Sequence, residues 1–464
     1  MSAPILWIIV PLALSAAMLF LLNYARVLKV LGIIVSMVLA ITAFIQPIGN
    51  VLQFGSFALD ISPDFFIFGR SLVLENSDRF ALSLVYSSLF LFLVIMDVRT
   101  IPSKFVPLSI AISAMLIAAL AVQPFLYSAV LVEMAVLLIV LMVREKQNQP
   151  VTGIIRFLIY LTLAMPSVLF AGWILGGSQT GAFAETRMLS AVAFLLFGFA
   201  VWLAVFPFHS WMPQFSQTVK PFLFSFIFSI VPVITLLIII KYLSGLLWLK
   251  SSTFLAPALQ TIGTIMIITT GIFTSVEKDL KRFMAYTVLL ETGFALVMLS
   301  LATADGIQLL YQAFIPRIIA LVLLGYSLMV IDNAGLSLMT DDLRGVLKRL
   351  PFASVGVFSS LLSIVGFPLS AGFPLRFETI NLLGQTTRTT IIWIFAGLIG
   401  FLIGAIRIFV RFAAPGAEKW QINEKISQIL IIGFGLVLLF ILGLFPRLIE
   451  IIISPFLAEI PDLW

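Results

Sequence analysis

The sequence has no cysteine and only one histidine, His209. Without thiolates the chain cannot form a disulfide, and it cannot hold thiolate-ligated zinc or an iron–sulfur cluster. A single histidine also cannot supply both ligands of a bis-histidine haem. We therefore expect no cofactor and no metal in this chain, and any redox chemistry would lie in a partner subunit.

Charge is also scarce. Of the 464 residues, 61% are hydrophobic and 10% are charged. No soluble globular protein has an interior large enough to hide that much apolar side chain, so lipid must surround most of the chain. The run ILIIGFGLVLLFILGLF at 429–445 is apolar at every position, which excludes the alternating strands of a transmembrane barrel. The composition predicts an all-α polytopic membrane protein.

Apolar runs between charged breaks predict about 14 transmembrane helices, each of about 20 residues. The N-terminal run lacks a basic region before it, so it is interpreted as the first helix and not as a cleaved signal. The longest connection, 47–78, places β-branched and aromatic residues between turn residues, which predicts a small hairpin. The expected spans are 5–22, 30–46, 79–96, 105–121, 124–143, 157–175, 186–207, 222–243, 256–275, 284–302, 310–330, 352–380, 390–410 and 428–446.

Lysine and arginine are concentrated in connections that fall on one side of the predicted membrane. The positive-inside rule makes this side the cytoplasm, so both termini are expected outside. The same rule accounts for the net charge of +6 without any nucleic acid. No glycine-rich turn follows a strand and no soluble domain is present, so we expect no NADH binding. The basic connections are 26–29, 98–104, 143–147, 277–282, 341–349 and 411–425.

Two parts of the chain resemble each other. Glu133 and Glu291 each lie about one turn into an apolar helix, and the segments 186–213 and 352–380 each contain prolines within a span. Two inverted five-helix repeats are therefore expected at 105–243 and 256–411, with 1–104 and 412–464 flanking them. The prolines expected to break helices are Pro207, Pro213, Pro232, Pro316, Pro368 and Pro374.

Ionisable residues within or beside the spans are functional candidates, because charge buried in lipid is costly. Glu133 has no cation within two turns of its own helix, so it must be protonated or paired across helices. Lys241 could instead extend to the headgroups, Lys281 could be a cytoplasmic anchor, and Arg407 could extend to the inner face. The candidates for a proton path or for coupling are Glu133, His209, Lys241, Lys281, Glu291, Arg317, Arg376 and Arg407.

A family resemblance runs through five stretches, in order, between residues 77 and 446. They are FPFHSWMPQFSQ, DLKRFMAYTVLLETGFALVML, YQAFIPRIIALVLLGYSL, DDLRGVLKRLPFASVGVFSSLLSIVGFPLSAGFPLRF and LGLFP. Together they resemble the antiporter-like subunits of respiratory complex I, in particular the two of medium length. The same family includes large subunits of multisubunit cation/proton antiporters and of membrane-bound hydrogenases. The block at 281–293 is the most specific part of the resemblance.

The resemblance implies a fold of 14 helices with inverted repeats at spans 4–8 and 9–13, and a hydrated polar axis through the membrane. In the family a glutamate in span 5 pairs with a lysine in the broken span 7. A further lysine lies in span 8, and a lysine or glutamate lies in the broken span 12. Closely spaced carboxylate and ammonium groups shift each other's proton affinity, so forming or breaking one pair can move a proton to the next.

This sequence departs from that pattern at most of these positions. Glu133 matches the span 5 glutamate, but Trp202 occupies the span 7 lysine position. Val233 or Ile234 occupies the span 8 lysine position, and Leu321 stands where span 11 often has a histidine. Arg376 stands at the span 12 position, and arginine keeps its proton at any accessible pH. We expect the proton route of the first half to be broken or rerouted, and Glu133 to be neutral unless another helix supplies a cation.

These residues support three hypotheses. The first is a membrane-arm subunit of a complex I-type assembly with impaired or rerouted proton translocation, beside membrane partners that hold quinone, flavin and iron–sulfur clusters. The second is a subunit of a cation/proton antiporter or ion-coupled uptake system, and the third is a structural scaffold. A bacterial inner membrane is the expected location, and protons and sodium both remain open as the transported ion. His209, near the cytoplasmic end of the broken span 7, is either a structural imidazole or a proton port.

Overall fold

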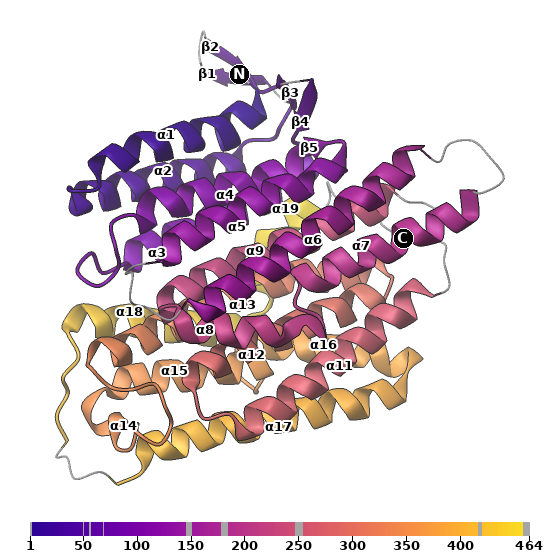
Figure 1. Cartoon of the computed structure of the whole chain (residues 1–464). Coiled ribbons are helices and arrows are strands. Elements are labelled where there is room, and N and C mark those ends of the chain that lie inside the picture. Colours follow the sequence, from indigo (N-terminus) through magenta and orange to yellow (C-terminus); the bar gives the residue numbers. More distant parts are fainter. Residues whose placement is uncertain are drawn as a thin grey trace. The chain divides into compact units, whose positions relative to one another are not determined.

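The computed structural model describes residues 2–49, 51–54, 57–67, 69–144, 151–177, 184–245, 254–415 and 420–457. Helices make up most of these residues, and short strands form two small sheets (Figure 1). Packing divides the chain into two compact units. One contains Met1–Leu203, Ile230–Leu246 and Phe456–Pro461, and the other contains Ala204–Ser229, Leu247–Pro455 and Asp462–Trp464. Residues 145–147 and 416–419 of two predicted basic connections and 458–464 of the predicted outer tail lie outside the described residues.

Apolar helices build the first unit. Within it, α2 packs against α3, α4 against α5, and α6 against α7. The sides of α4 are buried almost all round, as expected for a helix without a polar face. Its helices are α1 (Val10–Met18), α2 (Ala25–Ile45), α3 (Arg79–Ile95), α4 (Phe105–Ala121), α5 (Ser128–Val143), α6 (Thr152–Gly177), α7 (Ala184–Trp202) and most of α9 (Pro221–Gly245), with short turns η1 (Ile5–Ile9), η2 (Leu19–Leu21), η3 (Asn76–Asp78) and η4 (Phe125–Tyr127).

The hairpin predicted in the connection 47–78 is present, and the connection forms two of them. Strands β1 (Val51–Phe54) and β2 (Phe57–Asp60) pair antiparallel, with Val51 opposite Asp60. Strands β3 (Asp64–Ile67) and β4 (Arg70–Val73) form the second hairpin. The short strand β5 (Val122–Gln123), which follows α4, pairs with β4 and anchors this hairpin to the helices.

The second unit is built around α12. Residues 283–300 of this helix are all buried, and α11, α13 and α8 pack against it. Helix α17 lies against α11 on the side of the unit that Figure 1 shows at the bottom. The helices are α8 (Trp211–Thr218), the start of α9, α11 (Leu255–Val276), α12 (Leu280–Ser300), α13 (Ala304–Asn333), α14 (Val346–Arg349), α15 (Pro351–Val365), α16 (Phe373–Thr386), α17 (Arg388–Ala413), α18 (Ile426–Leu444) and most of α19 (Arg447–Leu457), with the turn η5 (Phe208–Ser210).

Two predicted spans are interrupted, as expected. Helix α7 ends at Trp202 before η5 and α8, and α15 ends at Val365 before α16. Pro207 and Pro368 lie inside these breaks. Ala204 and Leu369, also within the breaks, have left-handed backbone with φ of 51° and 70°. Because this conformation costs a non-glycine residue of the order of 1 kcal/mol, the surrounding packing must hold both breaks in place.

Two of the six predicted proline breaks are wrong. Pro232 lies inside the continuous helix α9 and Pro316 inside the continuous helix α13. Pro213 and Pro374 lie in the first turns of α8 and α16, the helices that follow the two breaks, where a missing N–H has no partner within the helix to lose. A helix continues through a proline when the freed carbonyl four residues earlier finds another donor. The carbonyl of Phe228, four residues before Pro232, accepts from Nη2 of Arg317 at 3.4 Å.

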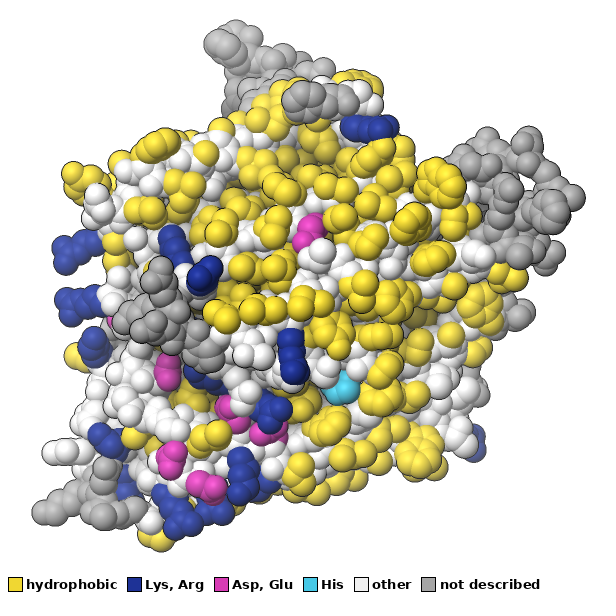
Figure 2. Space-filling view, viewed as in Figure 1, with side chains coloured by type: hydrophobic (Ala, Val, Ile, Leu, Met, Phe, Trp, Pro, Cys, Tyr) yellow, Lys and Arg dark blue, Asp and Glu magenta, His cyan; other side chains and the backbone are white. Residues whose placement is uncertain are grey.

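The described helices have the lengths and surfaces of a membrane protein. Ten of them are long and apolar enough to cross a membrane, and Ile5–Leu21, Phe105–Ala121, Leu189–Trp202 and Pro351–Val365 form shorter apolar helices. Large hydrophobic side chains are exposed along them, and Figure 2 shows hydrophobic side chains over most of the helical surface on this face. The chain is an integral membrane protein of the polytopic helical class, as the composition predicted.

Two features at the ends of the chain differ from the predicted organisation. The basic connection expected at 26–29 is the first turn of α2, because helix propensity extends the span past its charged end. The tail after span 14 contains the additional helix α19, whose sequence RLIEIIISPFL was too short to be counted as a span. The relation between the two predicted repeats remains a prediction.

Candidate functional site

A buried ion pair between Glu291 and Arg376 lies in the second unit. Glu291 is in the middle of α12, and Arg376 is in the first turn of α16; the two residues are 6% and 5% exposed. The Arg376 Nη2 atom donates to Oε1 of Glu291 and also to the carbonyl of Ile364 at 3.3 Å, in the last turn of α15. The guanidinium carbon lies 3.7 Å from the ring centroid of Phe294. Arg376 therefore joins a carboxylate to the negative end of the broken helix.

Arg317 is a second buried cation beside this pair. It is 3% exposed and follows Pro316 in α13. Its only hydrogen bond among the described residues is the long contact from Nη2 to the Phe228 carbonyl, and its Nε and Nη1 atoms are buried without a partner. The Nε atom of Arg376 is also buried and unpartnered. Two buried guanidinium groups therefore lie near one carboxylate, which pairs with Arg376.

A small cavity connects the three charged groups. Its volume is about 10 Å³, which is close to the space of a single water molecule. The first turn of α16 borders it through Leu375 and the preceding Gly372. Because the lining contains two guanidinium groups and one carboxylate, the cavity carries an excess of one positive charge. Its lining residues are Glu291, Ala313, Pro316, Arg317, Ala320, Ser363, Ile364, Gly372, Leu375 and Arg376.

Helix α15, whose broken end Arg376 caps, is fixed at its other end by Glu424. The Glu424 carboxylate accepts from the backbone N–H groups of Phe352 at 3.1 Å and Ala353 at 2.6 Å. This satisfies two donors at the start of the helix and places negative charge at the positive end of its dipole. Burial raises the pKa of Glu424, and these two hydrogen bonds oppose that shift.

His209 borders a separate small cavity in the same unit. The imidazole stacks on Phe206, with ring centroids 5.4 Å apart, and lies 5.7 Å from the ring of Phe273. Its Nδ1 atom is buried without a partner among the described residues. The cavity also touches Tyr286 of α12 and has a volume of about 10 Å³. His209 therefore packs as an aromatic side chain, and it does not border the cavity of Glu291 and Arg376.

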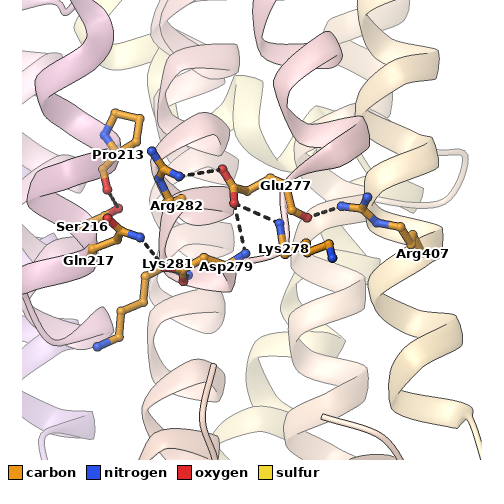
Figure 3. Close-up of polar contacts among 9 residues, drawn as sticks. All are labelled: Pro213, Ser216, Gln217, Glu277, Lys278, Asp279, Lys281, Arg282 and Arg407. Atoms are coloured by element: carbon orange, nitrogen blue, oxygen red, sulfur yellow. Dashed lines mark hydrogen bonds and ion pairs between the residues drawn. The ribbon is translucent and has the colours of Figure 1, made fainter. Parts of the chain in front are cut away.

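The connection between α11 and α12 holds a polar cluster that contains two further candidates (Figure 3). The Glu277 carboxylate lies 3.7 Å from Arg282 and accepts from the backbone N–H groups of residues 278 and 279. Arg407 of α17 donates to the Glu277 carbonyl, so it caps the end of α11. Asp279 begins α12 by accepting from the backbone of Lys281 at 2.8 Å, and it also accepts from Gln217 of α8 at 2.8 Å.

Arg407 and Lys281 differ in their contacts, and the roles of both stay predictions. Arg407 donates to the backbone carbonyl of Glu277, within the predicted basic connection 277–282, so its extension toward the inner face stays a prediction. The Lys281 side chain points away from the cluster in Figure 3, and its ammonium has no partner among the described residues. The cluster ties together α8, the start of α12 and α17. It stabilises this end of the second unit without joining the buried pair.

With this geometry in view, the chain can be compared with known proteins. Residues 174–404 match the family described as NADH:quinone oxidoreductase/Mrp antiporter, transmembrane region. The chain is a member of this family. The NADH-quinone oxidoreductase subunit N of Pelagibacter ubique is 27% identical over 278 residues, which is 56% of this chain and 56% of that protein. The chain thus spans about half the length of this curated relative.

Solved structures show the same antiporter-like fold. A chain of respiratory complex I from Thermus thermophilus superposes with a TM-score of 0.73 at 16% identity, covering 95% of this chain and 97% of that chain. A chain of the Mrp complex from a Dietzia species superposes with a TM-score of 0.80 at 15% identity, covering 98% and 96%. At these identities the similarity establishes the fold of the antiporter-like subunit.

The positions at which the family resemblance implied lysines are filled by apolar packing. Trp202 is 4% exposed and lies against Phe199, with ring centroids 5.8 Å apart. Phe199 in turn contacts Tyr242 edge-on at 6.0 Å. Val233 and Ile234 are 1% and 0% exposed. These residues form ordinary core contacts, so none of them can supply a charge to Glu133.

Glu133 has a polar neighbour instead of a cation. It lies partly exposed in the middle of α5, and its Oε1 atom accepts from the hydroxyl of Thr162 on α6 at 2.7 Å. No cation pairs with it among the described residues. The neighbouring Met134 and Leu137 are exposed, so Glu133 lies at the surface of the first unit between apolar side chains.

Lys241 forms a salt bridge within the first unit. Its ammonium pairs with both carboxylate oxygens of Asp78 at 2.9 and 2.8 Å, and it donates to the carbonyl of Leu120 at 3.4 Å. The two side chains are 18% and 6% exposed. This pair connects α9 to η3 within the first unit. It is a largely buried salt bridge that the alternatives considered for Lys241 did not include.

Replacing Lys241 by methionine is expected to lower the free energy of unfolding by about 2–4 kcal/mol, because it leaves the Asp78 carboxylate buried without its cation. Thermal unfolding of the purified protein in mild detergent measures the loss. The double variant that combines Lys241→Met with Asp78→Asn should regain more than half of the stability that Lys241→Met alone loses. Equal stability of K241M and the wild type would show that the pair contributes nothing.

Several residues of these sites were missed by reasoning from the sequence. Asp78 and Asp279 lie in connections, where an acidic residue carries no signal of its own. Gln217 and Thr162 are uncharged, so the search for ionisable residues passed over them. Only the Asp279 position had a detectable signal, since an aspartate directly before an apolar helix is a common N-cap.

Proposed function

We propose that this antiporter-like subunit belongs to the membrane arm of a proton-translocating complex of the NADH-quinone oxidoreductase type, and that its own proton translocation is impaired or rerouted. The observation that carries the proposal is the chemistry of the buried cluster. The second unit keeps a buried charged pair, but its cation is an arginine, and the first unit has apolar residues where the family resemblance implied lysines. The subunit would influence its neighbours through the electric field of its fixed buried charges and not by carrying protons itself.

The geometry suggests how such a charge would act. Arg376 cannot release a proton, so it cannot pass one on. Its guanidinium is shared between Glu291 and the carbonyl of Ile364 at the broken end of α15. A change of charge in a neighbouring subunit would alter this balance, because Coulomb forces are strong at low dielectric. Arg376 would then couple neighbouring subunits electrostatically without carrying protons itself.

The proposal includes the surroundings of the chain. Its partners are other membrane subunits, and quinone, flavin and iron–sulfur clusters would lie among them. No group of three or more potential metal-ligating side chains occurs in the described part of this chain. We propose a bacterial inner membrane as the location, with both termini on the outer side. The carboxylate of Glu133, partly exposed between apolar side chains of α5, marks a surface that a neighbouring subunit would cover.

Two substitutions test whether the relay of the first half or the fixed charge of the second half matters. Glu133→Gln in the reconstituted whole complex should leave coupled ion flux within about twofold of the wild type, because no lysine is in place to exchange a proton with Glu133. Arg376→Met, with assembly confirmed, should lower the flux about tenfold or more, which corresponds to about 1.4 kcal/mol. A large loss in E133Q would establish a working relay. Full activity of R376M would contradict the fixed-charge proposal and would support the hypothesis that the subunit is a structural scaffold.

A cation/proton antiporter subunit is a second candidate. The observation in its favour is the TM-score of 0.80 to the chain of the Mrp complex, against 0.73 to the chain of complex I. Copurification in mild detergent separates the two. Partners with quinone and iron–sulfur clusters would support the respiratory assignment, whereas several small antiporter subunits and sodium-dependent flux would replace it.

A further inference from the structure

We propose that the cavity between Arg317 and Arg376 is a binding site for a small inorganic monovalent anion such as chloride. The inference goes beyond the proposed function, since it holds whether or not the complex moves protons. It rests on three features of the second unit that point to the same place. These are an excess positive charge, buried N–H groups without acceptors, and the N-terminus of a helix.

The charge comes first. Arg317 and Arg376 are 3% and 5% exposed and keep their protons at any accessible pH, whereas the only acidic residue lining the cavity is Glu291. Charge taken out of water is tolerated only when it is paired and hydrogen-bonded. One bound monovalent anion would bring the cluster to neutrality. A water molecule could accept hydrogen bonds there but would leave the charge uncompensated.

The unpartnered donors define where the anion would bind. The Nε and Nη1 atoms of Arg317 and the Nε atom of Arg376 are buried without a partner among the described residues. Buried polar groups almost always have partners in folded proteins, so three such atoms around one cavity indicate an absent acceptor. The Glu291 oxygen nearest to Arg376 is already engaged. The Nε and Nη1 donors of Arg317 have no such acceptor among the described residues.

The helix adds a third contribution. The 14-residue helix α16 begins at Phe373, and its first turn borders the cavity through Leu375 and Arg376, with Gly372 just before it. The N-terminus of a helix carries partial positive charge and attracts anions. The cavity volume of about 10 Å³ admits one small species and excludes sulfate or a carboxylic acid. The small size of the cavity therefore favours a single-atom anion over sulfate or a carboxylic acid.

Thermal unfolding of the full-length protein in chloride and in gluconate, at equal ionic strength, tests the site. We expect the unfolding midpoint to rise with chloride concentration and to saturate, because a ligand of the native state stabilises it. Arg317→Met should abolish this dependence while the protein still folds, since Glu291 keeps its partner Arg376. Arg407→Met is the matched control, because Arg407 lies outside the cavity, and it should keep the full chloride dependence.

Crystallography can detect the bound anion directly, without a measurement of stability. Crystals grown in bromide should show anomalous density between Arg317 and Arg376, and this density should vanish in R317M. Identical unfolding midpoints of the wild type in chloride and gluconate would overturn the proposal. So would a chloride dependence that survives in R317M, or density that identifies an ordered water at this position in bromide.

Discussion

Replacing Glu291 by glutamine is expected to lower the free energy of unfolding by about 3–5 kcal/mol, one of the largest effects of any single substitution in this chain. Glutamine keeps the size of the side chain and one oxygen that Arg376 can still reach, so packing changes little. What disappears is the only acidic group in a cavity lined by two buried guanidinium groups. Arg317 and Arg376 would then repel each other at low dielectric without a carboxylate between them.

A second substitution separates this electrostatic cause from a general loss of packing. Arg376→Met alone should cost less than E291Q, because Arg317 borders the same cavity and remains as a cation for Glu291. The double variant E291Q/R376M returns the cavity to a single excess positive charge, as in the wild type. We therefore expect the double variant to be more stable than E291Q alone. Thermal and denaturant unfolding in mild detergent give the double-mutant cycle.

Glu133 provides the matched control for the same chemical change. Glu133→Gln also replaces a carboxylate within an apolar helix, but Glu133 is partly exposed and its described partner is the Thr162 hydroxyl. An amide oxygen can accept that hydrogen bond equally well, so the loss should be below about 1 kcal/mol. Similar losses in E133Q and E291Q would contradict the ion pair, as would strictly additive effects of E291Q and R376M.

The sequence was sufficient for the fold class because membrane solvation acts on each segment independently. A run such as 429–445 must form a helix in lipid, whatever its neighbours do, since its backbone has no other way to satisfy its hydrogen bonds. The prolines within the segments 186–213 and 352–380 likewise located the two broken spans. The isolated prolines Pro232 and Pro316 were misjudged because a proline breaks a helix only when no donor replaces its N–H. That donor comes from another helix, as Arg317 does for the Phe228 carbonyl.

The candidate site was predictable only in part, because contacts between distant helices cannot be read from the local sequence pattern. Glu291, Arg317 and Arg376 stood out individually, because each is a charge within an apolar segment. Their convergence could not be derived from local pattern, since Glu291 and Arg376 are 85 residues apart in the chain. Lys241 and Asp78 are 163 residues apart, and the pair remained unseen because Asp78 belongs to a connection that looks like solvent-exposed turn sequence. Pairing across such distances is a property of the tertiary packing.

Replacing Gly397 by leucine is expected to lower stability by about 3 kcal/mol or more, because α11 and α17 are in contact through their glycines. A Cβ atom at Gly397 would lie 2.5 Å from the backbone oxygen of Ile267, and one at Gly400 would lie 2.7 Å from that of Gly271. Backbone atoms cannot rotate aside as a side chain can. The two helices would have to separate along several turns.

The displacement would also reach the buried pair. Helix α11 uses Gly263 to approach α12, where an added Cβ would lie 2.6 Å from the backbone oxygen of Gly293, two residues from Glu291. G397L should therefore reduce the yield of monodisperse protein and lower the unfolding midpoint. The control is Gly433→Leu in α18, where an added Cβ meets nothing within 4 Å. If both leucine variants lose stability equally, added bulk in any span is the cause. If only G397L loses stability, the glycine contact between α11 and α17 is needed to position the helices around the buried pair.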